Sequence, residues 1–299
     1  MFTLSPPHHH LLLRGLSSAS TTTCRAVATP NPCISDTPDT APTPSRNRNK
    51  NKNAVPDPAL RSTWAHRAWV AAGSAAVLAA MSNSASAAAD SGSLLEPALA
   101  AALGYVLADL GSGFYHFGID NYGGTSTPVF GPQIEAFQGH HRRPATITRR
   151  QPANNLHALA RAVALAVVPL ELAVGAAVPP SSAAAAAAHA FVGACAGCIM
   201  LSQQFHAWAH GAKGRVPHWV EALQGAGVLI SRDMHGAHHR VPYNNNYCIV
   251  SGVWNPLLDE YRVFEAVELV IYFRFGVRPR SWGETAKEWK EEEEEEDIL

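Results

Sequence analysis

Histidines recur in this sequence at spacings that bring imidazole rings together. His206 and His210 form the motif HxxxH, and His235, His238 and His239 form the motif HxxHH. Residues three or four apart share one face of a helix, so each motif can direct its rings toward one point. Because imidazole nitrogen is a common ligand of transition metals, the two motifs predict metal binding.

Two further motifs extend the set of candidate ligands. The segment HFGID places a histidine and an aspartate four residues apart, and QGHHRR supplies two adjacent histidines. One tetrahedral zinc ion takes four ligands, whereas eight histidines and one carboxylate are about enough for two ions with open positions. The number of ligands therefore favours a dinuclear centre. The candidate ligands and catalytic residues are His116, Asp120, His140, His141, His206, His210, His235, His238 and His239.

The same residues exclude some metal chemistries and favour another. A zinc peptidase of the HExxH type needs a glutamate directly after its first histidine, where this chain has Ala207. Soluble di-iron bundles use glutamate and ExxH ligands, whereas this set is almost entirely imidazole. Neutral imidazole suits iron, and two iron ions with open positions can activate O2 to attack an unactivated C–H bond of a lipid chain. We therefore expect two iron ions as cofactors, with O2 as a co-substrate.

Long apolar segments must position these residues. About 20 helical residues span the hydrocarbon core of a membrane. Serines and Asn83 dilute the first candidate segment, Pro169 and Glu171 interrupt the third, and Pro179–Pro180 marks a turn before the fourth. We expect an all-α integral membrane helical bundle of about four spans with added interfacial helices. The candidate spans are 69–88, 94–117, 156–178 and 183–205.

The order of the spans places the histidines on one membrane face. The second and fourth spans end on the same side, and the pair His140–His141 lies in the loop after the second. The stretch 216–239 has too few apolar residues to cross, so it should lie at the interface or re-enter. Arginines in the loop assign this face to the cytoplasm-equivalent side by the positive-inside rule, which is the stroma in a plastid. These arginines are Arg142, Arg143, Arg149 and Arg150.

The two ends of the chain differ from the apolar middle. Residues 1–60 are rich in Ser, Thr, Pro and Asn with no acidic residue before Asp36, which is typical of a transit peptide and linker. This composition favours a plastid over a mitochondrion, and a secretory signal is the alternative. Residues 61–280 are expected to form the membrane domain, and 281–299 a solvated acidic tail. The tract His8–His10 would be removed with the presequence.

Composition narrows the function further. The formal net charge is −1 and the pI is about 6.9, so no basic field indicates nucleic acid as a partner. The five cysteines do not form the pattern of a disulfide framework. Cys195 and Cys198 form a CxxC within a run of small residues in an apolar segment, which indicates helix packing rather than redox chemistry.

Several longer segments resemble a known family. The segments DLGSGFYHFGIDNYGGTSTPVFG, QGHHRRPATITRRQPANN, FHAWAHG and HGAHHRVPYNNNYCIVSGVWNPLLDE resemble the Kua family of plasmanylethanolamine desaturases. Within that family they are most similar to the plastid fatty acid desaturase 4 type. The resemblance covers about residues 94–275, which is nearly the whole expected membrane domain.

The resemblance implies an activity. Similar plant proteins introduce a trans double bond at the delta-3 position of palmitate on phosphatidylglycerol, using O2 and electrons from ferredoxin, in a chloroplast membrane. It also places the family's histidine motifs on the nine candidate residues, with Asp120 as a ligand or as a residue that orients an imidazole. A double bond near the carboxyl end requires a metal centre near headgroup depth, which agrees with histidines at the ends of spans.

Other readings stay open at this point. The same oxidant can hydroxylate a lipid or carotenoid, and a membrane carrier of haem or metal would place its histidines at mid-span or along a path. Polar residues near the motifs can either support the ligands or form turns, and the arginines can either bind an anionic headgroup or set topology. The polar residues are Asn154, Asn155 and Asn244–Asn246, and the histidines expected to be structural or interfacial are His66, His157, His189 and His218.

Overall fold

The computed structural model describes residues 57–283 of the chain. The expected transit peptide up to residue 56, with His8–His10, Cys24 and Cys33, lies outside the described residues. The acidic tail from residue 284 lies outside them as well. Residues 281–283 are described, and Ser281 and Trp282 each donate a hydrogen bond to the carboxylate of Glu268.

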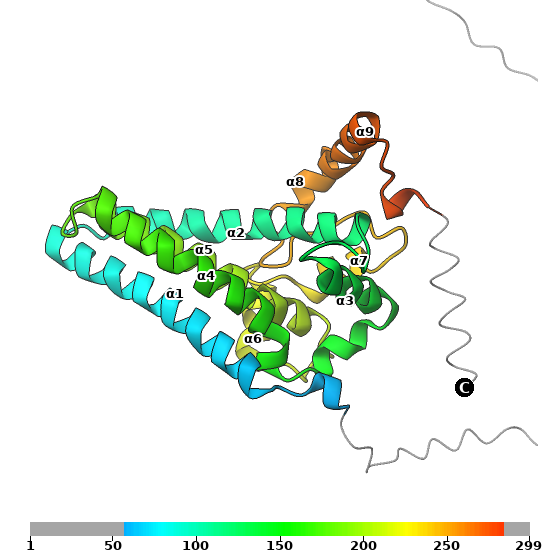
Figure 1. Ribbon diagram of the computed structural model, residues 1–299, viewed down its shortest axis with the longest axis horizontal. Helices are drawn as coiled ribbons and strands as arrows, with labels where there is room; N and C mark the ends of the chain where they lie inside the picture. Colours follow the sequence, from blue (N-terminus) through cyan, green and yellow to red (C-terminus); the bar gives the residue numbers. More distant parts are fainter. Residues whose placement is uncertain (1–56, 284–299) are drawn as a thin grey trace, which may run out of the picture. The chain divides into compact units, whose positions relative to one another are not determined.

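The described residues form helices and no strand, which confirms the expected all-α class (Figure 1). Four helices are long, and the others are short segments at one end of the bundle that the long helices form. The long helices are α1 (Trp64–Ser91), α2 (Leu95–Asn121), α4 (Pro152–Ala177) and α5 (Ala183–Ala209). The short ones are η1 (Pro58–Leu60), α3 (Gly131–Arg142), η2 (Pro144–Arg149), α6 (His218–Gly225), α7 (Arg232–His238), α8 (Asn255–Glu260), α9 (Val263–Phe275) and η3 (Arg280–Trp282).

The four long helices coincide with the four apolar segments seen in the sequence. Three of them, α2, α4 and α5, are long and apolar enough to cross a membrane. Helix α1 is as long as these but is not among the three, because serines and Asn83 lower its hydropathy. The expected four spans are therefore an approximate count.

Helix α4 is continuous through Pro169 and Glu171, the residues that interrupt its apolar sequence. Pro169 lies inside the helix, which extends from Pro152 to Ala177. Glu171 is mostly buried, and its carboxylate lies 2.8 Å from His189 Nδ1 on α5 and accepts a hydrogen bond from Asn83 on α1. Neighbouring helices thus satisfy the polar group, and a proline is tolerated in a membrane helix for the same reason.

Helix α5 is the centre of the bundle, because it packs against α1, α2 and α4 (Figure 1). Small residues permit this close packing. A Cβ on Gly104 of α2 would lie 2.7 Å from the carbonyl oxygen of Phe191 and 3.1 Å from the backbone nitrogen of Cys195, both on α5. Cys195 and Cys198 are half-buried and unpaired. Cys195 therefore lies where α5 packs against α2.

The pair His140–His141 lies on a helix, not in a loop as expected. Both residues belong to the last turn of α3. The helix begins at Gly131 with Pro132 in its first turn, where a proline has no hydrogen bond to lose, and the buried Ile134 anchors it. The sequence of α3 is weakly apolar and short, which explains why its periodicity did not reveal it.

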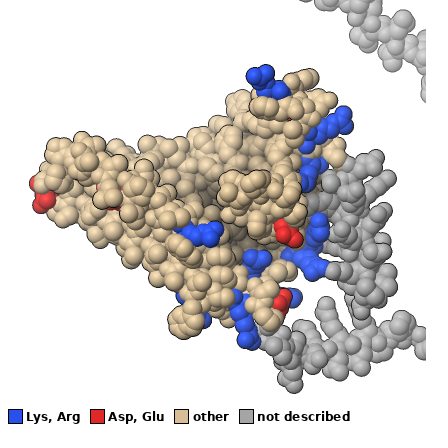
Figure 2. Space-filling view, viewed as in Figure 1, with Lys and Arg blue, Asp and Glu red and all other residues tan. Residues whose placement is uncertain are grey.

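The outer surface of the long helices is apolar. Leu99, Leu103 and Leu107 of α2 and Leu165 and Leu172 of α4 are exposed, with Leu172 71% accessible. Figure 2 shows that the flank of the bundle is almost free of charged side chains, whereas Lys and Arg gather toward the end that carries the short helices. A surface of this kind suits the hydrocarbon core of a membrane with a polar region at one end.

Candidate metal centre

All nine candidate ligands lie together at the end of the bundle where α2 and α5 end. They divide into two groups with no shared member, and within each group one ligand atom per residue lies within 4.8 Å of all the others. The groups are adjacent, because the ring centroids of His238 and His239 are 5.5 Å apart and those of His116 and His206 are 5.9 Å apart. We name them the five-histidine group (His140, His206, His210, His235 and His239) and the aspartate group (His116, Asp120, His141 and His238).

Three helices and the residues that follow them supply the five-histidine group. His210 is central, since its Nε2 lies 2.9 Å from that of His140 on α3, 3.2 Å from that of His206 on α5 and 2.8 Å from that of His235 on α7. The Nε2 atoms of His235 and His239 are 3.1 Å apart. Nitrogens that share a metal ion at about 2 Å lie about 3 Å from one another, so the spacing fits coordination.

The aspartate group surrounds one carboxylate oxygen. Asp120 Oδ2 lies 3.2 Å from His116 Nε2, 3.5 Å from His141 Nε2 and 3.4 Å from His238 Nε2. Asp120 follows His116 by one turn of α2, so the helix itself sets this pair. All four residues are buried.

Backbone carbonyls fix two rings of the aspartate group. His116 Nδ1 donates to the carbonyl of Tyr247 at 2.9 Å, and His238 Nδ1 donates to the carbonyl of Asn245 at 2.7 Å. A carbonyl oxygen only accepts, so Nδ1 carries a hydrogen in each ring, and Nε2 is the nitrogen that can offer a lone pair. Two lone pairs therefore face the oxygen of Asp120, which is also an acceptor. Acceptors facing one another in a buried site are the arrangement that a bound cation would stabilise, so these residues fit a metal ion.

The segment 245–255 that supplies those carbonyls is held by a residue that the sequence reading did not select. Asp109 is fully buried in the middle of α2, and its Oδ1 accepts from the backbone N–H groups of Val250, Ser251 and Gly252 at 2.8 to 3.1 Å. An aspartate in an apolar span costs free energy unless its carboxylate has hydrogen-bond partners. The position of Asp109 within an apolar segment could therefore have marked it as important from the sequence. Asp109 therefore positions the backbone that orients His116.

Two more polar side chains hold the same segment. Ser112, one turn after Asp109, accepts a hydrogen bond from the N–H of Ile249 at 3.0 Å. Asn255 accepts from the N–H of Cys248 at 2.8 Å and donates to its carbonyl at 3.0 Å. Residues 245–254 have no regular secondary structure, so side chains replace the missing backbone partners.

Burial keeps the imidazoles outside the spans neutral. It lowers the pKa of His141 to about 3 and that of His210 to about 4, and it lowers the pKa of His140 well below its usual value. Neighbouring imidazoles add to the effect at His140 and His210. A neutral imidazole is the form that binds a metal, so these residues are ready to act as ligands at neutral pH.

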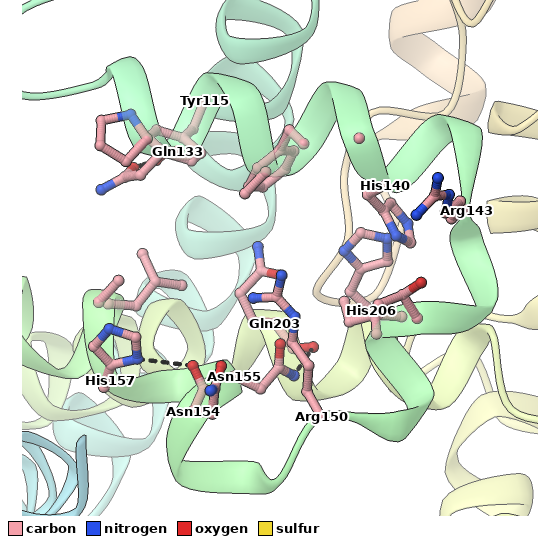
Figure 3. A pocket seen from close by; sticks show the side chains of 18 residues that line it. Tyr115, Gln133, His140, Arg143, Arg150, Asn154, Asn155, His157, Gln203 and His206 are labelled. Atoms are coloured by element: carbon pink, nitrogen blue, oxygen red, sulfur yellow. Dashed lines mark hydrogen bonds between the residues drawn. The ribbon is translucent and has the colours of Figure 1, made fainter. Parts of the chain in front are cut away.

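A pocket of about 450 Å³ opens beside the five-histidine group (Figure 3). His140 and His206 belong both to that group and to the wall of the pocket. Apolar and aromatic side chains line much of the remaining wall, together with a few polar ones. They include Tyr115, Phe137, Ile147, Leu159, Gln133, Asn155 and Gln203. The geometry therefore brings a cavity suited to an amphiphile directly to the candidate ligands.

The remaining polar candidates have mostly structural contacts. Asn154 Nδ2 donates to the carbonyls of Ala59 and Arg61, and Asn155 Nδ2 donates to that of Gln203. Asn246 contacts no candidate ligand in these hydrogen bonds, because its backbone N–H donates to the carboxylate of Asp259. Among these asparagines, Asn245 supports a candidate ligand, and it does so through its backbone.

The histidines outside the motifs do not join either group. His189 pairs with Glu171, and His218 lies on the surface, 3.7 Å from Glu221. His66 and His157 stack with ring centroids 3.9 Å apart. His157 also lines the pocket, which the sequence reading did not anticipate, and its Nδ1 donates to the carbonyl of Asn154 (Figure 3).

Comparison with known proteins identifies the family. The model of the lipid desaturase domain matches residues 105–282, which contain all nine candidate ligands. The chain belongs to the lipid desaturase family. It is an enzyme of the acyl-lipid desaturase type, and the expected resemblance to the Kua family is confirmed.

Relatives of this lipid desaturase include plant and bacterial proteins. It is 58% identical to fatty acid desaturase 4, chloroplastic, of Arabidopsis thaliana, over 78% of this chain and 69% of that protein. Identity to fatty acid desaturase 4-like 1, chloroplastic, from the same plant is 53%, over 80% of this chain and 78% of that protein. Identity to the plasmanylethanolamine desaturase of Myxococcus xanthus is 34%, over 60% of this chain and 61% of that protein. No solved structure matches the chain.

Proposed function

We propose that this lipid desaturase introduces a trans double bond at the delta-3 position of palmitate carried by phosphatidylglycerol. Two of its relatives are named as chloroplastic fatty acid desaturases, which supports a fatty acid substrate and a chloroplast membrane. The observation that carries the proposal is that nine candidate ligands lie in two adjacent groups beside a cavity with apolar walls. The headgroup, the acyl chain and the geometry of the double bond are proposed from the sequence resemblance.

The five-histidine group and the aspartate group would each hold one iron ion. Asp120 is proposed as a ligand rather than a residue that only orients a ring, because its Oδ2 faces the Nε2 atoms of His116, His141 and His238. The Nδ1 atoms of His116 and His238 donate to backbone carbonyls, which leaves their Nε2 atoms to face Asp120. When bound, the two irons would use O2 and electrons to oxidise an unactivated C–H bond.

The residues of the chain would bind and orient the substrate. His140 and His206 form part of the pocket wall, so an acyl chain in the pocket contacts the five-histidine group without an intervening layer of protein. Tyr115, Phe137 and Leu159 offer the chain an apolar surface. Burial of the ligands excludes bulk water from the reacting carbon, which limits side reactions.

The depth of the site supports a double bond near the carboxyl end. His116 lies one turn before the end of α2, and His206 lies in the last turn of α5. With a rise of about 1.5 Å per residue, both lie within roughly 8 Å of the helix ends. A membrane lipid presents the first carbons of its acyl chain at that depth, close to the headgroup.

The compartment and the electron donor are part of the proposal. We propose that the active site faces the stroma, because the arginines at the end of α3 and in the segment that leads to α4 lie near the histidines, and two of them, Arg143 and Arg150, line the same pocket as His140 and His206. A ferredoxin-type protein on that face would deliver the electrons. The presequence at 1–60, the membrane domain at 61–280 and the acidic tail at 281–299 belong to the same proposal.

The test is expression of the full chain in a host with a plastid electron donor, followed by fatty acid analysis of each lipid class. Trans-3-hexadecenoate confined to phosphatidylglycerol is expected. His206→Ala and His238→Ala should each abolish the product, since each removes a ligand of one group. His218→Ala is the control, because its exposed ring lies outside both groups.

Two results would contradict the proposal. A hydroxylated product would show that the enzyme is a hydroxylase. An intense Soret band in the purified protein would show that it binds haem instead of two iron ions. Full activity in both ligand variants at unchanged protein level would refute the assignment of the two groups.

A further inference from the structure

The last turn of α2 carries Asp120, and the helix does not complete this end by itself. The last four carbonyl groups of a helix have no partner within it, and a positive charge near them is favourable. The carbonyl of Asp120 is one of these four, because α2 ends at Asn121. The last turn of α2 contains no basic residue. A donor for this carbonyl must therefore come from outside the helix.

Arg280 is such a donor, although it lies 160 residues further along the chain. Its Nη1 donates to the carbonyl of Asp120 at 3.1 Å, and its Nη2 donates to the carbonyl of Gly123. Figure 1 shows how the segment after α9 comes back to the end of α2. Arginine side chains at the end of a helix stabilise its last carbonyls, so Arg280 caps the helix end that holds a proposed metal ligand.

The same guanidinium group also binds α3. With the side-chain oxygen of Gln138 turned toward Arg280, this oxygen accepts from Nη1 at 2.8 Å and from Nη2 at 3.0 Å. Gln138 lies on α3, three residues before His141 of the aspartate group. Arg280 therefore connects the ends of the two helices that carry Asp120 and His141.

The residues after Arg280 hold its backbone against α9. The side chains of Ser281 and Trp282 donate to the two carboxylate oxygens of Glu268 at 2.6 Å and 2.7 Å. Glu268 is only 3% exposed and lies on α9. These bonds restrict the backbone from which the guanidinium group extends, so less freedom is lost when it binds α2 and α3.

The same segment contacts the aspartate group by a second path. The N–H of Ser281 donates to Asn121 Oδ1 at 3.1 Å, and Asn121 Nδ2 donates to the hydroxyl of Tyr247 at 2.8 Å. The carbonyl of Tyr247 in turn accepts from His116 Nδ1. Two members of the group, His116 and Asp120, thus depend on contacts that begin at residues 280 and 281.

We propose that Arg280 is a positioning residue for the metal centre, and that it holds Asp120 of α2 and His141 of α3 at the separation that one shared ion requires. The inference rests on the proposed iron pair and adds the residue that aligns its aspartate group. A guanidinium group suits this role, because its five N–H donors in one plane can bind two carbonyls and an amide oxygen together.

The five-histidine group depends less on this contact. One of its members, His140, belongs to α3. The others lie on α5 and α7 or directly follow these helices, and they are His206, His210, His235 and His239. Loss of Arg280 should therefore weaken metal binding by the aspartate group more than by the five-histidine group.

Arg280→Ala and Arg278→Ala form a matched pair of variants, because they remove the same side chain two residues apart. Arg278 lies over the ring of Tyr272, with its Cζ 5.7 Å from the centroid. The metal-free full chain is titrated with iron(II) in the absence of O2. Affinity for one of the two ions should fall about tenfold in Arg280→Ala, a typical effect of losing a residue that orients a ligand. Arg278→Ala should bind both ions like the wild type.

Spectroscopy shows which site has changed. Mössbauer spectra of the iron-loaded protein should show one altered site in Arg280→Ala and one that matches the wild type. A role in general stability alone would not alter one iron site and spare the other. Arg280→Lys should recover part of the affinity, because it keeps the charge and a donor but not the planar set of N–H groups.

Hydrogen exchange of the metal-free chain is a readout that needs no iron. The amides of residues 119–123 should exchange faster in Arg280→Ala than in the wild type, because the end of α2 loses its cap. Amides in the middle of α5 should exchange at the same rate in both proteins. If Arg280→Ala does not fold, Arg280→Lys is compared with the wild type in all three measurements.

The outcomes separate the inference from the proposed function. A wild type that binds no iron would overturn the proposed function, whereas hydrogen exchange would still decide whether Arg280 holds the end of α2. Two ions bound with equal affinity by Arg280→Ala and the wild type would overturn the inference while the function stands. Equal weakening of both ions, or the same loss in Arg278→Ala, would also overturn it, because either result indicates a general loss of stability.

Discussion

Asp120 is the single anionic ligand proposed among eight imidazoles, and its charge has no substitute within the site. Its Oδ2 lies within 3.5 Å of the Nε2 atoms of His116, His141 and His238. Asn keeps the shape of the side chain but removes the charge that would hold a cation among neutral rings. The variant Asp120→Asn therefore separates the contribution of the charge to metal binding from that of the geometry.

We expect Asp120→Asn to lower the iron content of the purified protein from about two ions to about one per chain, since only the aspartate group loses its anion. Elemental analysis of metal per chain checks this result. The His218→Ala variant should keep both ions. An unchanged iron content in Asp120→Asn would show that Asp120 is not a ligand.

The buried imidazoles also predict how stability depends on pH. The pKa of His141 is lowered to about 3 and that of His210 to about 4 in the folded chain, against about 6.5 when unfolded. Between pH 6.5 and 4 the unfolded state binds more protons, so the free energy of unfolding falls as the pH falls. The slope is at most about 1.4 kcal/mol per pH unit for each imidazole.

Metal-free protein in detergent should thus unfold at progressively lower temperature from pH 6.5 to pH 4, and change little from pH 7 to pH 8. Thermal unfolding followed by circular dichroism measures this dependence. The His218→Ala variant should show the same curve, because His218 is exposed. A flat profile below pH 6.5 would contradict the burial of neutral rings.

At the scale of elements, the segment 245–255 decides whether the aspartate group is well ordered. Asp109 of α2 binds three of its backbone N–H groups, and the carbonyl of Tyr247 in turn fixes His116. This dependence connects a residue at mid-span to a proposed ligand two turns later on the same helix.

Asp109→Ala should reduce the free energy of unfolding by about 3 kcal/mol or more, because several buried N–H groups lose their acceptor. It should also reduce iron content, since His116 loses its fixed orientation. Asp109→Asn keeps an acceptor oxygen and should lose less of both. Equal stability of Asp109→Ala and the wild type in a thermal unfolding assay would contradict the role assigned to this residue.

Close contact between α2 and α5 gives another prediction for an element. Gly104→Val should weaken their packing, since its Cβ would lie 2.7 Å from the carbonyl oxygen of Phe191. Gly111→Val on the same helix is the control, because a Cβ there has nothing within 4 Å. A lower unfolding temperature is expected for Gly104→Val alone. Similar losses in both variants would indicate an effect of helix propensity instead.

Sequence alone located most of these elements, for a physical reason. Long apolar runs and paired histidines are local patterns, so the four long helices and all nine candidate ligands could be predicted. Helix α3 is short and polar, and the partners of Asp109 lie about 140 residues away, so neither produces a local pattern. The division of the ligands into two groups and the pocket depend on tertiary packing, which periodicity does not encode.

At the scale of the whole molecule, α5 connects the apolar bundle to the site. It packs against the other three long helices and carries His206 in its last turn, with His210 directly after it. A rigid helix at the centre of the bundle fixes these two rings with little loss of side-chain freedom. The candidate ligands on α3 and α7 lie around the end of this central helix.

The buried carboxylate of Asp109 has a consequence for how the chain is assembled in its membrane. Its partners, the N–H groups of Val250 to Gly252, lie 141 to 143 residues further along the chain. If α2 enters the membrane before these partners have been synthesised, the carboxylate of Asp109 lies in lipid without hydrogen bonds from them, at a cost of about 3 kcal/mol. We therefore expect α2 to reach its full stability in the membrane only after residues 250–252 have been synthesised and bind Asp109.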